Sequence, residues 1–180
     1  TSVGIIEKGN ELRSDSIEEG DAIIALQSAG PRSNGFSLMR KILSEKYGEN
    51  WHTEKWRSGT WGDVLLTPSI IYHAALLSLL GRFGEDRTVE IKALTHVTGG
   101  GIPENLARTL KKSGFGAALT DLWEPHDFFK DLVELGGMET EEAYRTWNMG
   151  TGMLVIVAPT DVDTVTDALV SQKIQAKQAG

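Results

Sequence analysis

The chain has 180 residues, of which 40% are apolar and 24% charged, an ordinary composition for one globular domain. Its 25 acidic against 18 basic side chains give a net charge of −7, which disfavours nucleic acid and anionic membranes as partners. Any anionic ligand must therefore be held by local groups. The sequence contains no cysteine, which excludes disulfides, thiolate metal sites and a cysteine nucleophile. With no apolar run near the ~20 residues of a membrane span and no secretory signal, we expect a cytoplasmic protein.

The first predicted elements are a strand, a glycine-rich turn and a helix. Residues 21–27, "DAIIALQ", contain five consecutive apolar residues, which indicates a strand buried on both faces. The turn spans Gly30 to Gly35. From Phe36 the apolar residues follow helical spacing, and Ser33 or Asn34 is the expected N-cap.

A polar segment with three tryptophans follows, over residues 49–63, and we expect a long loop there. Its tryptophans either stack on a base, cover a partner domain, or form a small apolar cluster that pins the loop. Thr67 and Pro68 predict the start of a helix that continues through residues 70–80, because proline suits the first helical position.

The rest of the chain continues to alternate strands with helices. Strands are predicted over residues 88–97, 116–122 and 153–158, and helices from Pro103, over residues 125–135 and after Thr160. The last residues, "IQAKQAG", suit an edge strand. This order predicts an α/β fold, a two-layer sandwich of a mixed β-sheet with helices packed mainly on one face.

Two turns share the order strand, glycine-rich loop and helix N-terminus, "AGPRSNGFS" and "TGGGIPEN". Their glycines permit close approach, and the unpaired N–H groups and positive dipole of the next helix suit an anion. The alternative is that the glycines only connect strands to helices. The candidate phosphate-binding residues are Gly30, Arg32, Ser33, Asn34, Gly35, Thr98, Gly99, Gly100 and Gly101.

Three further residues are candidates for chemistry. In "YRTWNMGTGM", Arg145 and Asn148 precede a buried strand, where an arginine suits phosphate or carboxylate, or is simply a surface residue. His96 ends a predicted strand beside the triple glycine, as a catalytic group or a structural one. The remaining histidines lack metal-ligand spacing, so we expect no zinc site.

Four motifs in order, "GPRSNGFSLMRKIL", "LLTPSIIY", "THVTGGGIPENLAR" and "YRTWNMGTGM", resemble the C-terminal domain of the phosphoribosylformylglycinamidine cyclo-ligase (aminoimidazole ribonucleotide synthetase) family. The likeness covers nearly the whole chain. It implies an inter-domain linker and lead-in strand over residues 1–20 and the C-terminal domain over residues 21–180. Because the first methionine is Met39, we expect a part of a longer, two-domain enzyme whose N-terminal ATP-binding domain is absent here.

The resemblance implies an enzyme of purine biosynthesis, homodimeric when complete, that closes an imidazole ring on formylglycinamidine ribonucleotide. In that chemistry ATP, with Mg²⁺, phosphorylates the formamide oxygen and an amidine nitrogen attacks the same carbon. ATP and Mg²⁺ are then bound mainly by the N-terminal domain, and the isolated domain is expected to be inactive. We expect the two glycine loops to hold a phosphate, Arg145 and Asn148 to orient substrate or stabilise negative charge, and His96 to transfer a proton.

Two alternatives stay open. One is another ATP-dependent enzyme of the same superfamily, with a different acceptor. The other is a non-catalytic domain for ligand binding or dimerisation. The family usually has histidine at Arg32, and arginine and lysine at Ile70 and Ala74, and these departures motivate the second alternative.

Overall fold

The computed structural model describes residues 3–180, and four of its strands form one sheet in the order β4-β5-β1-β6. All three neighbouring pairs are antiparallel. The strands are β1 (Ala22–Gln27), β4 (Ile91–His96), β5 (Thr151–Val157) and β6 (Ala176–Gln178). The strands predicted from the sequence at 21–27, 88–97 and 153–158 are thus confirmed, and the final residues form the expected edge strand.

The sheet is not mixed as expected, since each described pairing is antiparallel. The helical connections do join strands that point the same way, β1 to β4 and β5 to β6. In each case, however, a third strand lies between the two: β5 separates β4 from β1, and β1 separates β5 from β6. Because β1 and β4 run in the same direction, the loops that follow them leave the same edge of the sheet.

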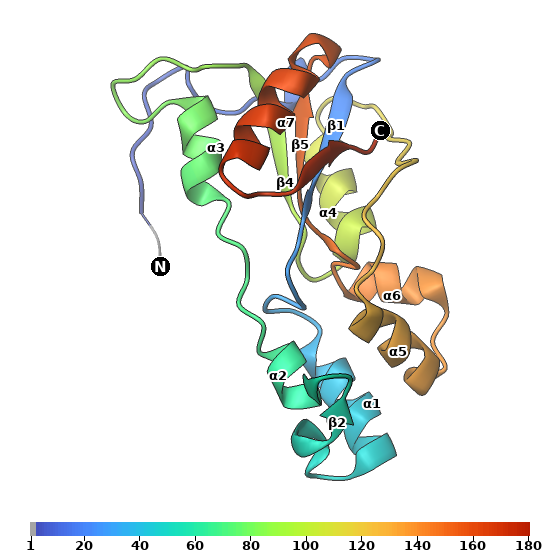
Figure 1. Ribbon diagram of the computed structural model, residues 1–180. Coiled ribbons are helices and arrows are strands. Elements are labelled where there is room, and N and C mark those ends of the chain that lie inside the picture. Colours follow the sequence, from blue (N-terminus) through green and yellow to red (C-terminus); the bar gives the residue numbers. More distant parts are fainter. Residues whose placement is uncertain (1–2) are drawn as a thin grey trace.

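Helices cover both faces of the sheet (Figure 1). Ile24 and Val155 pack under α3 (His73–Leu80) and α7 (Val162–Ser171), whereas Ile23 and Ile156 face α4 (Gly101–Leu110). The short helix η3 (Pro159–Asp161) precedes α7. Side chains alternate across a strand, so the continuous apolar runs of β1 and β5 require cover on both sides. The expected two-layer arrangement with helices mainly on one face is therefore not confirmed.

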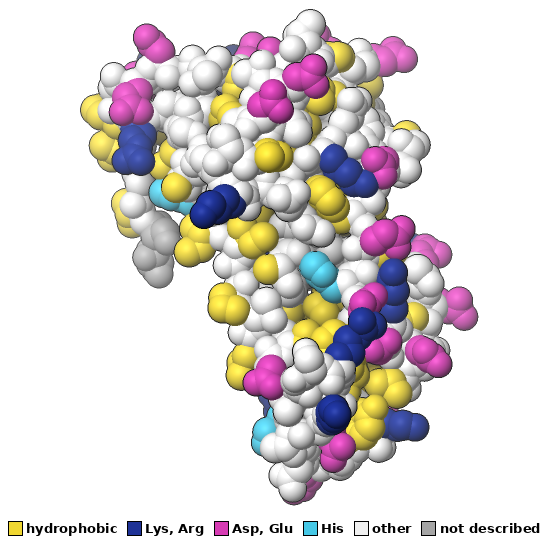
Figure 2. Space-filling model, viewed as in Figure 1, with side chains coloured by type: hydrophobic (Ala, Val, Ile, Leu, Met, Phe, Trp, Pro, Cys, Tyr) yellow, Lys and Arg dark blue, Asp and Glu magenta, His cyan; other side chains and the backbone are white. Residues whose placement is uncertain are grey.

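A second, helical lobe has its own core and gives the molecule an elongated outline (Figure 2). Phe129 and Trp147 are fully buried at its centre, with Met39 and Leu43 from α1. Trp51, Trp56 and Trp61 all join this cluster, which confirms that they pin their segment. Its elements are α1 (Phe36–Tyr47), η2 (Trp51–Thr53), β2 (Lys55–Trp56), β3 (Gly59–Thr60), α2 (Trp61–Leu65), α5 (Asp127–Gly136) and α6 (Thr140–Thr146).

Several predicted elements differ from the structure. The helix expected from Thr67 begins only at His73, because Thr67 packs against Gly30 and the chain then runs extended between the lobes (Figure 1). Residues 116–122, all of them described, form no strand. Leu119 and Leu122 instead pack toward α4, which produces the apolar alternation without a sheet partner.

The segment before β1 contains the 3-10 helix η1 (Ser14–Ser16) and, over residues 3–20, no strand. Residues 1 and 2 of the expected 1–20 linker and lead-in strand lie outside the described part. Buried Lys92 of β4 holds the end of this segment through Asp21, at 2.8 Å. Within residues 3–180 we find no helix whose length and apolarity would let it cross a membrane.

Candidate functional site

The two predicted glycine loops meet at one edge of the sheet. The first connects β1 to α1 and the second connects β4 to α4. The Thr98 hydroxyl donates a 2.7 Å hydrogen bond to Asn34 Oδ1. This use of the Asn34 side chain also explains why it does not cap α1, whose N-cap is Gly35 in a left-handed conformation. The predicted N-cap of α1, Ser33 or Asn34, was therefore wrong. The expectation that the two loops act together agrees with their contact through Thr98 and Asn34.

Three glycines of these loops are needed for packing. A Cβ at Gly101 would lie 1.7 Å from the Tyr144 carbonyl oxygen of α6, and one at Gly35 would lie 2.3 Å from the Trp147 ring. Gly30 is similarly close to Thr67, at 2.8 Å. A side chain at any of these positions would push two segments apart. These glycines fix the shape of the loops and do not present open surface.

The open surface of the site centres on Gly99. A Cβ there would meet only Asn34 Nδ2, at 3.7 Å, and Gly99 lacks the positive φ of its neighbours. Gly100 differs, because its φ is 92° and a Cβ would lie 2.3 Å from the Glu104 carboxylate. Glu104 thus covers part of the α4 N-terminus, and exposed Ser33 lies next to Asn34 in the first loop. Gly99 and Ser33 are thus exposed residues that adjoin, in the sequence, the Thr98–Asn34 contact.

Asn148 is buried, with only 5% of its surface exposed, and it clamps the first loop. Its Nδ2 donates to the Gly30 carbonyl at 3.0 Å. Its Oδ1 accepts from the Ser28 hydroxyl at 2.7 Å and from the Gly150 N–H at 2.9 Å. The side chain predicted to contact substrate therefore holds the β1–α1 loop against the turn before β5.

Arg145 lies on α6, next to Tyr144, whose carbonyl reaches Gly101. Its guanidinium is exposed and pairs with Glu141 one turn earlier, at 2.7 Å. An exposed i,i+4 pair of this kind is worth only about 0.3–0.5 kcal/mol, so the arginine is easily redirected to a ligand. The structure places Arg145 beside the second loop but engaged with its own helix.

Arg32 and His96 are in direct contact. Arg32, in a left-handed conformation with φ of 64°, donates to the Gly152 carbonyl and to His96 Nε2, and its guanidinium lies 5.6 Å from the Tyr72 ring centre. Among the described residues no carboxylate pairs with Arg32. Burial lowers the pKa of Arg32, and burial raises the pKa of Tyr72 to about 12.

The surroundings of His96 favour its neutral form. Partial burial lowers the pKa of His96, and the charge of Arg32 lowers it further. Since Nε2 accepts from the guanidinium, the neutral ring carries its proton on Nδ1. His96 is therefore a neutral group beside the loops, held by a cation that has no acidic partner within residues 3–180.

Asn105 is a site residue that the sequence reasoning missed. This buried amide donates from Nδ2 to the carbonyls of Gly101, Gly99 and Thr98, at 2.7, 3.2 and 3.3 Å. It fixes the second loop as Asn148 fixes the first. The available signal was an asparagine on the apolar face of a helix, one turn after three glycines, where a buried amide needs backbone partners.

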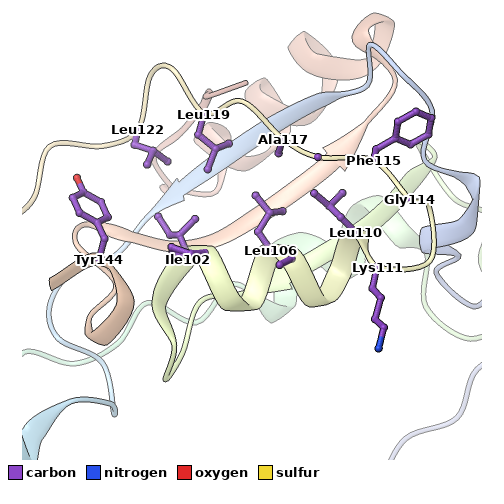
Figure 3. Close-up of a pocket in the computed structure, with 13 residues that line it drawn as sticks. Ile102, Leu106, Leu110, Lys111, Gly114, Phe115, Ala117, Leu119, Leu122 and Tyr144 are labelled. Carbon is purple, nitrogen blue, oxygen red and sulfur yellow. The ribbon is translucent and has the colours of Figure 1, made fainter. Parts of the chain in front are cut away.

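A cavity of about 580 Å³ lies between α4 and the segment that follows it (Figure 3). Ile102, Leu106 and Leu110 line it from α4, opposite Leu119 and Leu122, while the labelled Lys111 side chain points away from them. This lining supplies almost no charged or catalytic group. None of the residues predicted from the sequence to act in binding or catalysis lines this cavity.

Residues 18–180 match the family described as "AIR synthase related protein, C-terminal domain". The fold is an α/β domain with two glycine loops at one edge of its sheet. Because the family match covers most of the chain, the chain belongs to this family of AIR synthase related C-terminal domains.

Individual relatives agree with this assignment. The chain is 41% identical over 170 residues to the phosphoribosylformylglycinamidine cyclo-ligase of Thermoanaerobacter pseudethanolicus, covering 93% of this chain and 48% of the relative. It is 38% identical over 180 residues to the cyclo-ligase of Crocosphaera subtropica, covering 99% of this chain and 51% of the relative. The chain thus spans about half the length of the cyclo-ligases that it matches.

Two further matches place the domain in larger proteins. A "Bifunctional purine biosynthetic protein purD" from Dictyostelium discoideum is 39% identical in an alignment of 182 positions, which covers 99% of this chain and 22% of that protein. The solved structure "T. maritima PurL complexed with FGAR" matches 96% of this chain and 25% of its own, with a TM-score of 0.54. At 15% identity that structure shows the same fold only.

Proposed function

We propose that this chain is the C-terminal half of an ATP-dependent cyclo-ligase that converts formylglycinamidine ribonucleotide to aminoimidazole ribonucleotide in purine biosynthesis. The family match and the cyclo-ligase relatives support the reaction class. The observation that carries the proposal is the junction of two glycine loops through Thr98 and Asn34, with open surface at Gly99.

The substrate phosphate is assigned to the space at Gly99. The backbone at Gly99 and the part of the α4 N-terminus that Glu104 leaves uncovered favour negative charge there. Ser33 and Asn34 supply side-chain donors from the opposite loop. In a protein of net charge −7, such fixed local donors are what an anionic substrate requires.

Arg32, Arg145 and His96 are assigned to the reacting end of the substrate. Arg32 supplies a positive charge with no acidic partner among the described side chains, and Arg145 adds a second once it leaves Glu141. Neutral His96 is able to accept a proton only after Arg32 releases Nε2. We assign Asn148 to positioning, because its buried amide binds the Gly30 carbonyl and so holds the first loop.

ATP, when bound, supplies the phosphoryl group that turns the formamide oxygen into a leaving group. The described residues offer no group of three or more acidic or histidine side chains able to hold a metal ion. We therefore assign the contacts to ATP and Mg²⁺ mainly to an N-terminal domain that the longer relatives contain. A cytoplasmic homodimer of the complete enzyme is part of the same proposal.

Calorimetry on the 180-residue chain tests this assignment. Formylglycinamidine ribonucleotide should bind, and the corresponding nucleoside without phosphate should bind at least about tenfold more weakly, a difference of about 1.4 kcal/mol. Equal affinity for the two compounds would show that the glycine loops do not bind the phosphate. Absence of heat with either would favour a non-catalytic domain.

A further inference from the structure

The outer face of α1 carries a polar cavity that the proposed function does not use. Ser37, Arg40, Lys41 and Ser44 have the spacing i, i+3, i+4 and i+7, which places them on one side of the helix. Together with Trp51 they line a cavity of about 380 Å³, called here the α1 cavity. Its lining combines two cations, two hydroxyl groups and one indole.

Trp51 reaches this face because the chain reverses after α1. Gly48, with φ of 82°, donates its N–H to the Ser44 carbonyl at 2.8 Å, and the Trp51 N–H binds the Gly48 carbonyl at 3.2 Å. The indole packs against the helical core on one side and remains half-buried. It thus forms an aromatic wall of the cavity.

The charges of the α1 cavity are weakly compensated. Lys41 lies 3.9 Å from Glu45, and both side chains are about two-thirds exposed, at 69% and 67%. Arg40 has no ion-pair partner among the described residues. The only other cation of α1, Lys46, is five and six positions from this pair and lies on the opposite side of the helix. The lining of the α1 cavity therefore contains two cationic side chains and no acidic one.

We propose that the α1 cavity binds a nucleoside monophosphate, with its phosphate at Arg40 and Lys41 and its base against Trp51. Arginine and lysine both bind phosphate, and an indole face stacks on any base. From Ser37 to Ser44 the helix rises about 10 Å, long enough for such a ligand, and the volume lies within the usual range of small-molecule sites.

The direction of the ligand follows from the helix. The N-terminus of α1 is capped by Gly35 without a side-chain hydrogen bond, so its positive end favours the phosphate toward Ser37. The base then lies toward Ser44 and Trp51. This inference does not depend on the proposed cyclo-ligase function, because it uses none of the residues of the glycine loops.

Calorimetry and tryptophan fluorescence with AMP test the inference. AMP should bind the 180-residue chain, more weakly as salt is added, and the double variant R40Q/K41Q should lose at least about tenfold in affinity. Lys46→Gln removes a charge from the same helix and should leave affinity unchanged. Trp51→Phe keeps an aromatic ring in the core and should abolish the AMP-induced fluorescence change.

Three outcomes would overturn the inference. These are the absence of AMP binding, equal affinity in R40Q/K41Q and the unmodified chain, and equal affinity for AMP and inorganic phosphate. The variant Asn34→Ala distinguishes binding at the α1 cavity from binding at the glycine loops. It should leave the affinity for AMP unchanged. Loss of AMP binding in Asn34→Ala but not in R40Q/K41Q would place AMP at the glycine loops instead.

Discussion

The Thr98 hydroxyl and the Asn34 side-chain oxygen, 64 positions apart in the chain, share a 2.7 Å hydrogen bond. This bond ties the loop after β4 to the loop after β1 across the end of β5. It sets the distance between the two walls of the candidate phosphate site. The geometry of that site therefore depends on this polar pair together with the buried amides of Asn148 and Asn105, which hold each loop.

Removing this pair should weaken both the fold and ligand binding. In a double-mutant cycle of Asn34→Ala and Thr98→Val, we expect a coupling energy of about 1 kcal/mol in urea unfolding, as for an ordinary hydrogen bond. Affinity for the ribonucleotide should fall in each single variant. Strictly additive unfolding energies would show that the two loops are not coupled.

Gly99→Val should block the site without harming the fold. The new side chain has room, since a Cβ at Gly99 meets only Asn34 Nδ2 at 3.7 Å, and it would fill the space assigned to the phosphate. We expect ribonucleotide affinity to fall at least about tenfold while the melting temperature changes by less than about 2 °C. Unchanged ribonucleotide affinity in this variant would show that Gly99 does not border the bound phosphate.

Gly100→Val provides the contrast at the neighbouring position. With φ of 92° and the Glu104 side chain 2.3 Å from a new Cβ, the substitution should destabilise the protein by about 1–3 kcal/mol. Thermal unfolding measures the loss. A melting temperature equal to that of Gly99→Val would contradict the conformations assigned to this loop.

Asn148→Ala should act through stability. The change leaves the Ser28 hydroxyl, the Gly30 carbonyl and the Gly150 N–H without their side-chain partner in a buried environment. We expect a loss of about 2–4 kcal/mol in the free energy of unfolding by urea. A variant that keeps its stability but loses ligand affinity would return Asn148 to the direct contact predicted from the sequence.

The Arg32–His96 contact should be visible in pH titrations. Because the folded pKa of His96 lies below its ordinary 6.5, the unfolded chain takes up the proton more readily. The contribution of His96 to the free energy of unfolding is therefore lost as the pH falls from about 6.5 to its lower folded pKa. Above pH 6.5 the ring is neutral in both states and has no such effect. Arg32→Gln should raise the His96 pKa, measured by NMR of the imidazole, and an unchanged pKa would exclude an effect of the Arg32 charge.

The elements that sequence reasoning predicted well are those whose signal is local. The apolar run of β1 and the helical spacing from Phe36 depend on the residues of each segment alone, and both are confirmed. The glycine loops were recognised because strand, glycines and helix follow one another directly. Their joint use in one phosphate site came only from the family resemblance, because the directions of β1 and β4 and the position of β5 between them depend on long-range pairing.

The errors arise where a distant segment decides the conformation. Thr67 is held in an extended connection by Gly30, so α3 begins later than its proline predicts. Leu119 and Leu122 alternate like a strand because they pack toward α4. The backbone partners of the two buried asparagines are also distant or hidden in the sequence. Asn148 was therefore predicted to contact substrate and Asn105 was missed, although each amide binds a loop carbonyl.

The central claim is that the two glycine loops hold the phosphate of a ribonucleotide. Amide chemical shifts in NMR spectra of the 180-residue chain, titrated with formylglycinamidine ribonucleotide, test it most directly. The account predicts that the largest shifts fall on residues 33–35 and 98–101 together, and that the phosphate-free nucleoside does not reproduce them. Saturable shifts confined to other parts of the chain, with both loops unchanged, would contradict the claim.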